Sequence, residues 1–237
     1  MIIIPCRLNS SRFNKKVLVD VLGLPMFVRT AKQVEALDRI VVATDSKEVY
    51  DVAREYNIEV VMTSSDHQSG TDRISEAADV MALDPDEIII NVQADEPFIE
   101  PELVQKVMQK TRESYETSLL TSCYKRIDSE LADDPNHVKV VLDNLGDAVY
   151  FSRAKVPYHR DHYGTTPYYG HLGIYGFSKK NLFTFCNLSS STLEQTEKLE
   201  QLRAIDNGYK ISMIEVESKS FGIDTEEDLK NAIRIFG

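Results

Sequence analysis

The first half of the chain alternates short apolar runs with amphipathic stretches. Four of the apolar runs have the length of a strand: residues 1–6, 39–44, 59–62 and 87–92. Three of them carry Ile and Val at consecutive positions, a pattern typical of strands that are covered on both faces. The stretches between and after them predict helices over 25–36, 46–56, 71–83 and 101–112. We therefore expect a parallel sheet with helices above and below it.

From about residue 119 the pattern changes. Strand-like segments at 118–124, 138–142 and 148–151, with a turn at 143–146, predict antiparallel additions to the sheet. The stretch 157–170, rich in Tyr, His and Gly, fits neither a helix nor a clear strand. Helices near 179–186 and 193–207, a strand at 211–216 and a helix at 226–235 complete the prediction. Because no repeat or linker interrupts the chain, we predict one α/β domain over 1–237 with an inserted lobe at about 119–178.

Composition narrows the class of protein. The 237 residues, 42% hydrophobic and 27% charged, are enough for one large core. No apolar run reaches the roughly 20 residues of a membrane helix, and no secretion signal is recognisable, so we expect a soluble protein of the cytoplasm. Cys6, Cys123 and Cys186 are odd in number and widely spaced. This spacing favours reduced thiols over a disulfide or a zinc site.

The charge distribution indicates the kind of partner. A net charge of −11 argues against a nucleic-acid-binding surface, because phosphate backbones are held by clustered Lys and Arg. Residues 1–16 nevertheless contain Arg7, Arg12, Lys15 and Lys16 and no acidic residue. A small, highly charged anion is the natural partner of such a patch.

The stretch 7–16, RLNSSRFNKK, directly follows the first predicted strand. In open α/β sheets, ligands bind beyond the carboxyl ends of the strands. The stretch matches neither a Walker loop nor the dinucleotide fingerprint. Its small polar residues, Ser11 among them, would let backbone amides approach a polyphosphate, while Arg7, Arg12 and Lys16 supply charge. The alternative is a solvated basic loop.

Two acidic residues are candidates for holding a metal ion. Asp95 follows the predicted strand 87–92, where a magnesium ion that bridges to phosphate belongs; alternatively, it only begins the turn before the next helix. Asp224 precedes Thr225 and Asp228, whose spacing predicts a capping box, so its own carboxylate is expected to be free. We interpret Asp45 as part of the cap of helix 46–56, a structural role.

From end to end, the chain resembles the CMP-Kdo synthetases, the 3-deoxy-manno-octulosonate cytidylyltransferases. The matching segments are IIIPCRLNSSR, VVATDSKEV, TSSDHQSGTDRISEA, IIINVQADEPFI, HVKVVLD, YFSRAKVPY, GHLGIYGF, TLEQTEKLEQLRAIDNGYKI and FGIDTEEDL. The resemblance implies a three-layer nucleotide-diphospho-sugar transferase-like fold, a mixed, mostly parallel sheet with an antiparallel inserted lobe, and a homodimer. It implies transfer of CMP from CTP to the anomeric hydroxyl of Kdo, which activates Kdo for lipopolysaccharide synthesis with Mg²⁺ as cofactor.

The resemblance also implies roles for individual residues. Those expected to bind the nucleotide are Arg7, Ser11, Arg12, Lys16, Gln68, Ser69 and Arg73; Arg7, Arg12, Lys16 and Asp95 are expected to act in catalysis. Asp95 and Asp224 match the magnesium ligands. The positions expected to contact the sugar acid are Gln93, Arg153, His171, Tyr175, Glu200 and Gln201. One departure is Phe13-Asn14-Lys15, where the family usually has Leu-Pro-Gly.

The roles at the sugar site have alternatives. His171 and Tyr175 could be core residues with a satisfied polar tip, and Glu200 and Gln201 could belong to the polar face of a helix. For the whole protein, the alternatives are a cytidylyltransferase for another acceptor, such as sialic acid, and a nucleotide-binding protein without catalysis.

Overall fold

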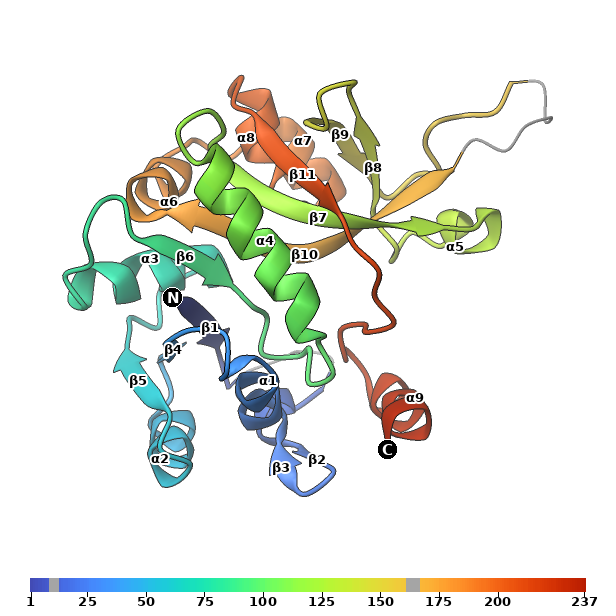
Figure 1. The fold of residues 1–237 in the computed structure, drawn as a ribbon. Helices are drawn as coiled ribbons and strands as arrows, with labels where there is room; N and C mark the ends of the chain where they lie inside the picture. Colours follow the sequence, from blue (N-terminus) through green and yellow to red (C-terminus); the bar gives the residue numbers. More distant parts are fainter. Residues whose placement is uncertain (9–12, 161–166) are drawn as a thin grey trace. The chain divides into compact units, whose positions relative to one another are not determined.

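Four parallel strands form the centre of the first of two units (Figure 1). Their order is β6 (Ile88–Asn91), β1 (Ile2–Cys6), β4 (Ile40–Thr44) and β5 (Glu59–Met62). The computed structural model describes residues 1–8, 13–160 and 167–237; this unit comprises Met1–Gln105 and Ser218–Gly237. Nearly all residues of β1, β4 and β6 are buried. The prediction of parallel strands covered on both faces is therefore confirmed.

The helices of the first unit follow the predicted order. They are α1 (Met26–Val34), α2 (Lys47–Glu55), α3 (Gly70–Val80) and α9 (Glu226–Phe236), while α4 (Pro101–Ser114) begins in this unit. The 3-10 helix η1 (Lys16–Leu18) and the short hairpin of β2 (Asp20–Val21) and β3 (Leu24–Pro25) precede α1. The cap of α2 is Ser46, whose side chain accepts from the Val49 amide, and not Asp45 as predicted.

The C-terminal segment of this unit packs against residues near the start of the chain. Ile223 and Ala232 share an apolar cluster with Val21, Met26 and Phe98. The amide of Ile223 also donates to the carbonyl oxygen of Asp95 at 2.9 Å. This packing brings the residue after Ile223 to the carboxyl end of β6, which decides where the site forms.

The second unit, Lys106–Glu217, contains the remaining strands. Strand β7 (Leu120–Ile127) pairs in parallel with β11 (Ile211–Glu215) and antiparallel with β10 (Tyr168–Ser178). Strands β8 (Lys139–Leu142) and β9 (Ala148–Ser152) form an antiparallel pair, and β8 also pairs with β10. The predicted antiparallel strands are thus confirmed, and β10 also includes the end of the stretch 157–170, which fitted neither a helix nor a clear strand.

The helices of the second unit are α5 (Ser129–Asp133), α6 (Lys179–Cys186), α7 (Thr192–Glu197) and α8 (Leu202–Asp206). The single helix predicted over 193–207 is two helices, because Lys198 has a left-handed backbone conformation with φ 54° that ends α7. The predicted lobe at 119–178 lies inside this longer unit. Within the described ranges, every helix is too short or too polar to span a bilayer.

Candidate active site

A polar cavity of about 280 Å³ lies in the first unit. Its walls come from the segments that directly follow β1 and β6, from η1 and from the start of α3. The lining includes Arg7, Lys16, His67, Gln68, Ser69, Arg73, Gln93, Asp95 and Asp224. The cavity thus gathers residues from both ends of the chain at the carboxyl end of the sheet, where ligands of open α/β sheets bind.

Lys16 joins the two acidic residues of the cavity. Its Nζ donates to Asp95 Oδ2 at 2.7 Å and to Asp224 Oδ1 at 2.8 Å. The lysine side chain is 11% exposed, whereas Asp95 and Asp224 are 29% and 46% exposed. Burial opposes the charged form of the lysine, but the two carboxylates outweigh it, so the pKa of Lys16 lies above its ordinary value. Asp224, expected to carry a free carboxylate, is therefore bound to Lys16.

The two carboxylates fit a magnesium ion. Both lie within hydrogen-bonding distance of one nitrogen atom, so their oxygen atoms converge on one point of the cavity. Mg²⁺ is bound in proteins through one or two carboxylates, with water and substrate phosphates as its other ligands. The described residues offer no group of three or more His, Cys, Asp or Glu side chains that could hold a metal ion without such help. The donor set thus suits a cation that arrives with a polyphosphate.

The basic stretch after β1 is described only in part. Ser11 and Arg12 lie outside the described residues. Arg7 is exposed, lines the cavity and has no ion-pair partner among the described residues. Lys15 pairs with Glu48, the two side chains 51% and 46% exposed, so Arg7 and Lys16 are the described cations of this stretch that face the cavity.

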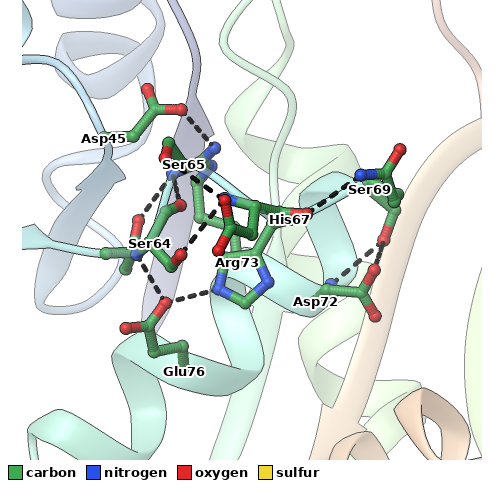
Figure 2. Close-up of polar contacts among 11 residues, drawn as sticks. Asp45, Ser64, Ser65, His67, Ser69, Asp72, Arg73 and Glu76 are labelled. Carbon is green, nitrogen blue, oxygen red and sulfur yellow. Dashed lines mark hydrogen bonds and ion pairs between the residues drawn. The ribbon is translucent and has the colours of Figure 1, made fainter.

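Arg73 is held by three groups around the start of α3. Its guanidinium donates to Thr63 Oγ1 at 2.6 Å, to the Ser64 carbonyl oxygen at 3.2 Å and to Asp45 Oδ2 at 2.8 Å. Figure 2 shows the contact between Arg73 and Asp45. Arg73 is 3% exposed. Asp45 therefore neutralises a buried arginine instead of capping α2, and the structural role predicted for it has a different physical basis.

Three other predicted residues of the cavity are tied to neighbouring groups. Ser69 caps α3: its Oγ accepts from the Asp72 amide at 3.1 Å and donates to the Asp72 carboxylate at 2.9 Å. Gln68 Nε2 donates to the Asp66 carbonyl oxygen at 3.0 Å. Gln93 Nε2 donates to Asn91 Oδ1 at 3.1 Å. Their expected contacts with nucleotide or sugar remain predictions.

Sequence reasoning missed one pair at this cavity, His67 and Glu76. His67 Nε2 makes a short contact with Glu76 Oε2 (Figure 2). Burial raises the pKa of Glu76, but the hydrogen bonds from the Ser64 amide and from His67, together with the nearby charge of Arg73, outweigh burial and hold that pKa below its ordinary value. His67 stands directly before Gln68 in the segment DHQSGTDR, so the signal was present in the sequence.

The second unit contains a network of predicted sugar-site residues. Tyr175 donates to Gln201 Oε1 at 3.1 Å, and Gln201 Nε2 contacts His171 Nδ1 at 3.4 Å. His171 Nε2 then lies 2.9 Å from Ser122 Oγ, which donates to the Ile174 carbonyl oxygen at 2.8 Å. This order of bonds defines a neutral imidazole with its proton on Nε2. The polar tips of His171 and Tyr175 are thus satisfied by protein groups.

Burial shifts the titration of this network. Packing of the His171 ring against Phe151 and Tyr175 shields it in large part from water, and this burial lowers its pKa to about 3. Burial, with the charge of Glu200 nearby, raises the pKa of Tyr175. Both side chains therefore keep their uncharged forms around neutral pH.

Glu200 and Gln201 lie between α7 and α8, outside both helices. The alternative that they belong to a helix's polar face is therefore wrong. Gln201 is 3% exposed. Glu200 Oε1 lies 4.0 Å from the Arg203 guanidinium. The side chain of Arg153 donates to the carbonyl oxygens of Glu197 and Pro135 at 2.7 and 3.0 Å. These two acceptors are uncharged, so they do not neutralise the guanidinium of Arg153, which can still attract a carboxylate.

Comparison with known proteins places this chain in a family. The sequence profile of the family described as "Cytidylyltransferase" matches residues 1–211. A 3-deoxy-manno-octulosonate cytidylyltransferase from Wolinella succinogenes is 52% identical over 100% of this chain and 99% of its own length. One of the same name from Helicobacter pylori (strain HPAG1) is 47% identical over 100% of this chain and 97% of its own.

A solved structure agrees with these relatives. The CMP:2-keto-3-deoxy-manno-octonic acid synthetase complexed with CTP superposes with a TM-score of 0.91 at 35% identity, over 99% of this chain and 96% of that one. With this agreement, the α/β fold and its polar cavity define a nucleotidyltransferase. The chain belongs to the cytidylyltransferase family and, within it, to the 3-deoxy-manno-octulosonate cytidylyltransferases.

Proposed function

We propose that this enzyme transfers CMP from CTP to the anomeric hydroxyl of 3-deoxy-D-manno-octulosonate (Kdo) and releases pyrophosphate. The observation that carries the proposal is the convergence of Asp95 and Asp224 on Lys16, in a cavity that Arg7 also lines. The names of the relatives and of the superposed synthetase supply the two substrates. Kdo activated in this way would serve lipopolysaccharide synthesis in the cytoplasm.

The reaction faces an electrostatic barrier. CTP carries about four negative charges, and the sugar acid carries another, so the substrates repel each other until basic side chains and a cation neutralise them. Arg7 and Lys16 provide positive charge at the cavity. We assign Arg12 the same role. These groups would stabilise charge that develops on the phosphoryl group and on the leaving pyrophosphate.

The chemical step is an in-line substitution at phosphorus. The anomeric oxygen forms a bond to the α-phosphorus, and the bond from that phosphorus to the bridging oxygen breaks. Pyrophosphate leaves with the electron pair, and the hydroxyl proton passes to solvent water. Asp95 and Asp224 would hold Mg²⁺, whose chemistry is to neutralise phosphate charge and lower the pKa of a bound hydroxyl. No covalent intermediate with the protein is needed.

We assign sugar recognition to the second unit. Arg153 would attract the carboxylate of Kdo, and the network of His171, Tyr175 and Gln201 presents a fixed set of polar groups. Glu200 is positioned beside Arg203, and Gln93 lines the nucleotide cavity of the first unit. We also propose that the enzyme acts as a homodimer, which light scattering after gel filtration would test.

The proposal is tested by pyrophosphate release. Purified enzyme is given CTP with Kdo, CTP with sialic acid, or CTP alone, each with Mg²⁺ and with the metal chelated by EDTA. We expect release only with Kdo and Mg²⁺. Pyrophosphate release with CTP and sialic acid, but not with CTP and Kdo, would reject Kdo as the acceptor. Saturable CTP binding without release under any condition would show a nucleotide-binding protein without catalysis.

A further inference from the structure

The cavity holds a histidine for which the proposed reaction gives no role. His67 lines the cavity together with Gln68, Ser69 and Arg73, and its side chain is 21% exposed. It lies between β5 and α3, while its partner Glu76 lies within α3. The imidazole is thus fixed from one side by the helix, and it also borders the cavity.

Glu76 decides which ring nitrogen carries the proton. A carboxylate only accepts hydrogen bonds, so the Nε2 that contacts Glu76 must carry hydrogen. Glu76 Oε2 also accepts from the Ser64 amide at 2.8 Å, which fixes the carboxylate in place. In the neutral ring, Nδ1 is then an acceptor, and the described residues give it no hydrogen-bond partner.

The neighbouring side chains are already engaged. Ser69 Oγ both donates to and accepts from Asp72, and Arg73 is shared among Thr63, Ser64 and Asp45. Figure 2 shows the pairs Ser69–Asp72, Arg73–Asp45 and His67–Glu76 around this stretch. Of the residues that the stretch places on the cavity, His67 therefore offers an acceptor that is oriented and unused.

We propose that His67 is a nucleotide-binding residue whose Nδ1 accepts a hydrogen bond from an N–H or O–H group of the cytidine moiety. Glu76 is the positioning residue that fixes the tautomer. The donor is the exocyclic amino group of cytosine or the 2′-hydroxyl group of the ribose, both of which a fixed acceptor can bind. This inference rests on the proposed function only in taking CTP as the ligand.

Two substitutions separate the two ring nitrogens. In His67→Gln, the side-chain amide nitrogen lies near the former Nε2, so the bond to Glu76 is kept and the Nδ1 acceptor is lost. In His67→Asn, the side-chain oxygen lies near the former Nδ1, so the acceptor is kept and the bond to Glu76 is lost. If His67 only braces the loop, His67→Gln will behave like wild type and His67→Asn will be impaired. If Nδ1 binds the nucleotide, the order is reversed.

The experiment is isothermal titration calorimetry of each variant with CTP, UTP and 2′-deoxy-CTP. We expect His67→Gln to raise the Kd for CTP about three- to tenfold, the size of one hydrogen bond, and His67→Asn to raise it less. His137→Gln is the matched control, since His137 pairs with Asp134 in the second unit and is 40% exposed; its Kd should equal that of wild type.

The nucleotide series identifies the donor. If the amino group donates, His67→Gln will lower the preference for CTP over UTP; if the 2′-hydroxyl donates, it will lower the preference for CTP over 2′-deoxy-CTP. An unchanged Kd for CTP in a folded His67→Gln, or a raised Kd with both preferences intact, overturns the inference. Pyrophosphate release by the wild-type enzyme tests the proposed function separately, so the two can fail independently.

Discussion

Lys16 Nζ lies 2.8 Å from Asp224 Oδ1, although 208 positions separate the two residues in the sequence. The same ammonium group also donates to Asp95. One positive charge is therefore shared between two carboxylates, which leaves a net negative charge at this point of the cavity. The balance among these three side chains decides how the site responds to a divalent cation.

Asp95→Asn should reduce turnover far more than stability. The substitution keeps the side-chain volume but removes a charged ligand, and losing one such electrostatic group lowers kcat by about 10²- to 10³-fold. Lys16 keeps Asp224 as its partner, so we expect the free energy of unfolding to fall by about 1–2 kcal/mol. Steady-state kinetics and urea unfolding measure the two effects. The control is Asp51→Asn, which alters an exposed ion pair with Lys47. Turnover of Asp95→Asn at the wild-type rate would refute the assignment of Asp95 as a metal ligand.

Lys16→Met should make the nucleotide-free protein more responsive to magnesium. Without the ammonium group, Asp95 and Asp224 repel each other, so the melting temperature should fall when no divalent cation is present. A cation that binds the folded state raises stability, so millimolar Mg²⁺ should raise the melting temperature of the variant more than that of wild type. The control is Lys15→Met, which changes the residue directly before Lys16. Lys15 pairs with Glu48, so this variant should respond to Mg²⁺ as wild type does. If Mg²⁺ raises the melting temperature of Lys16→Met and of wild type equally, the assignment of Asp95 and Asp224 as metal ligands is contradicted.

Sequence pattern alone predicted the parallel strands because residues such as Ile2, Ile3 and Ile4 are buried on both faces. It also predicted the capping box of Thr225 and Asp228, a local signal that the structure confirms. It could not show that Asp224 meets Lys16, because that contact depends on the packing of Ile223 against Val21 and Met26. Local spacing likewise misassigned Asp45, whose partner Arg73 belongs to another helix.

Glu100→Gln should destabilise the segment that leads to Asp224. Glu100 accepts from Ser218 Oγ and the Lys219 amide, each at 2.7 Å, and from the Ser220 amide at 3.3 Å. Burial raises the pKa of Glu100, but these hydrogen bonds outweigh it and lower that pKa below its ordinary value of 4.5. We expect a loss of about 1–3 kcal/mol at pH 7, since hydrogen bonds to a charged group are lost.

The pH dependence of this effect has a definite sign. Because the folded-state pKa of Glu100 is depressed, its contribution is present above the unfolded pKa and is lost as pH falls below about 4.5. The stability difference between wild type and Glu100→Gln, measured by urea unfolding, should therefore shrink in acid. Glu55→Gln, at an exposed position of α2, is the control. A difference that stays constant from pH 7 to acid would contradict the role of the charged form.

His171→Phe should remove a pH dependence from the stability of the protein. The folded-state pKa of His171 is about 3, against an ordinary value of 6.5, so the unfolded chain binds more protons between these values. The neutral ring therefore stabilises wild type above pH 6.5, and this contribution declines as pH falls toward 3. In urea unfolding, the free energy of unfolding should fall less between pH 7 and pH 5 in His171→Phe than in wild type.

The same variant should also be less stable at pH 7, by about 1–3 kcal/mol, because Ser122 and the buried amide of Gln201 each lose their contact with the ring. His137→Phe alters a histidine whose side chain is 40% exposed, and it should keep the wild-type loss between pH 7 and pH 5. If His171→Phe keeps that loss as well, another group titrates in this range and the neutral network around His171 does not set the pH dependence.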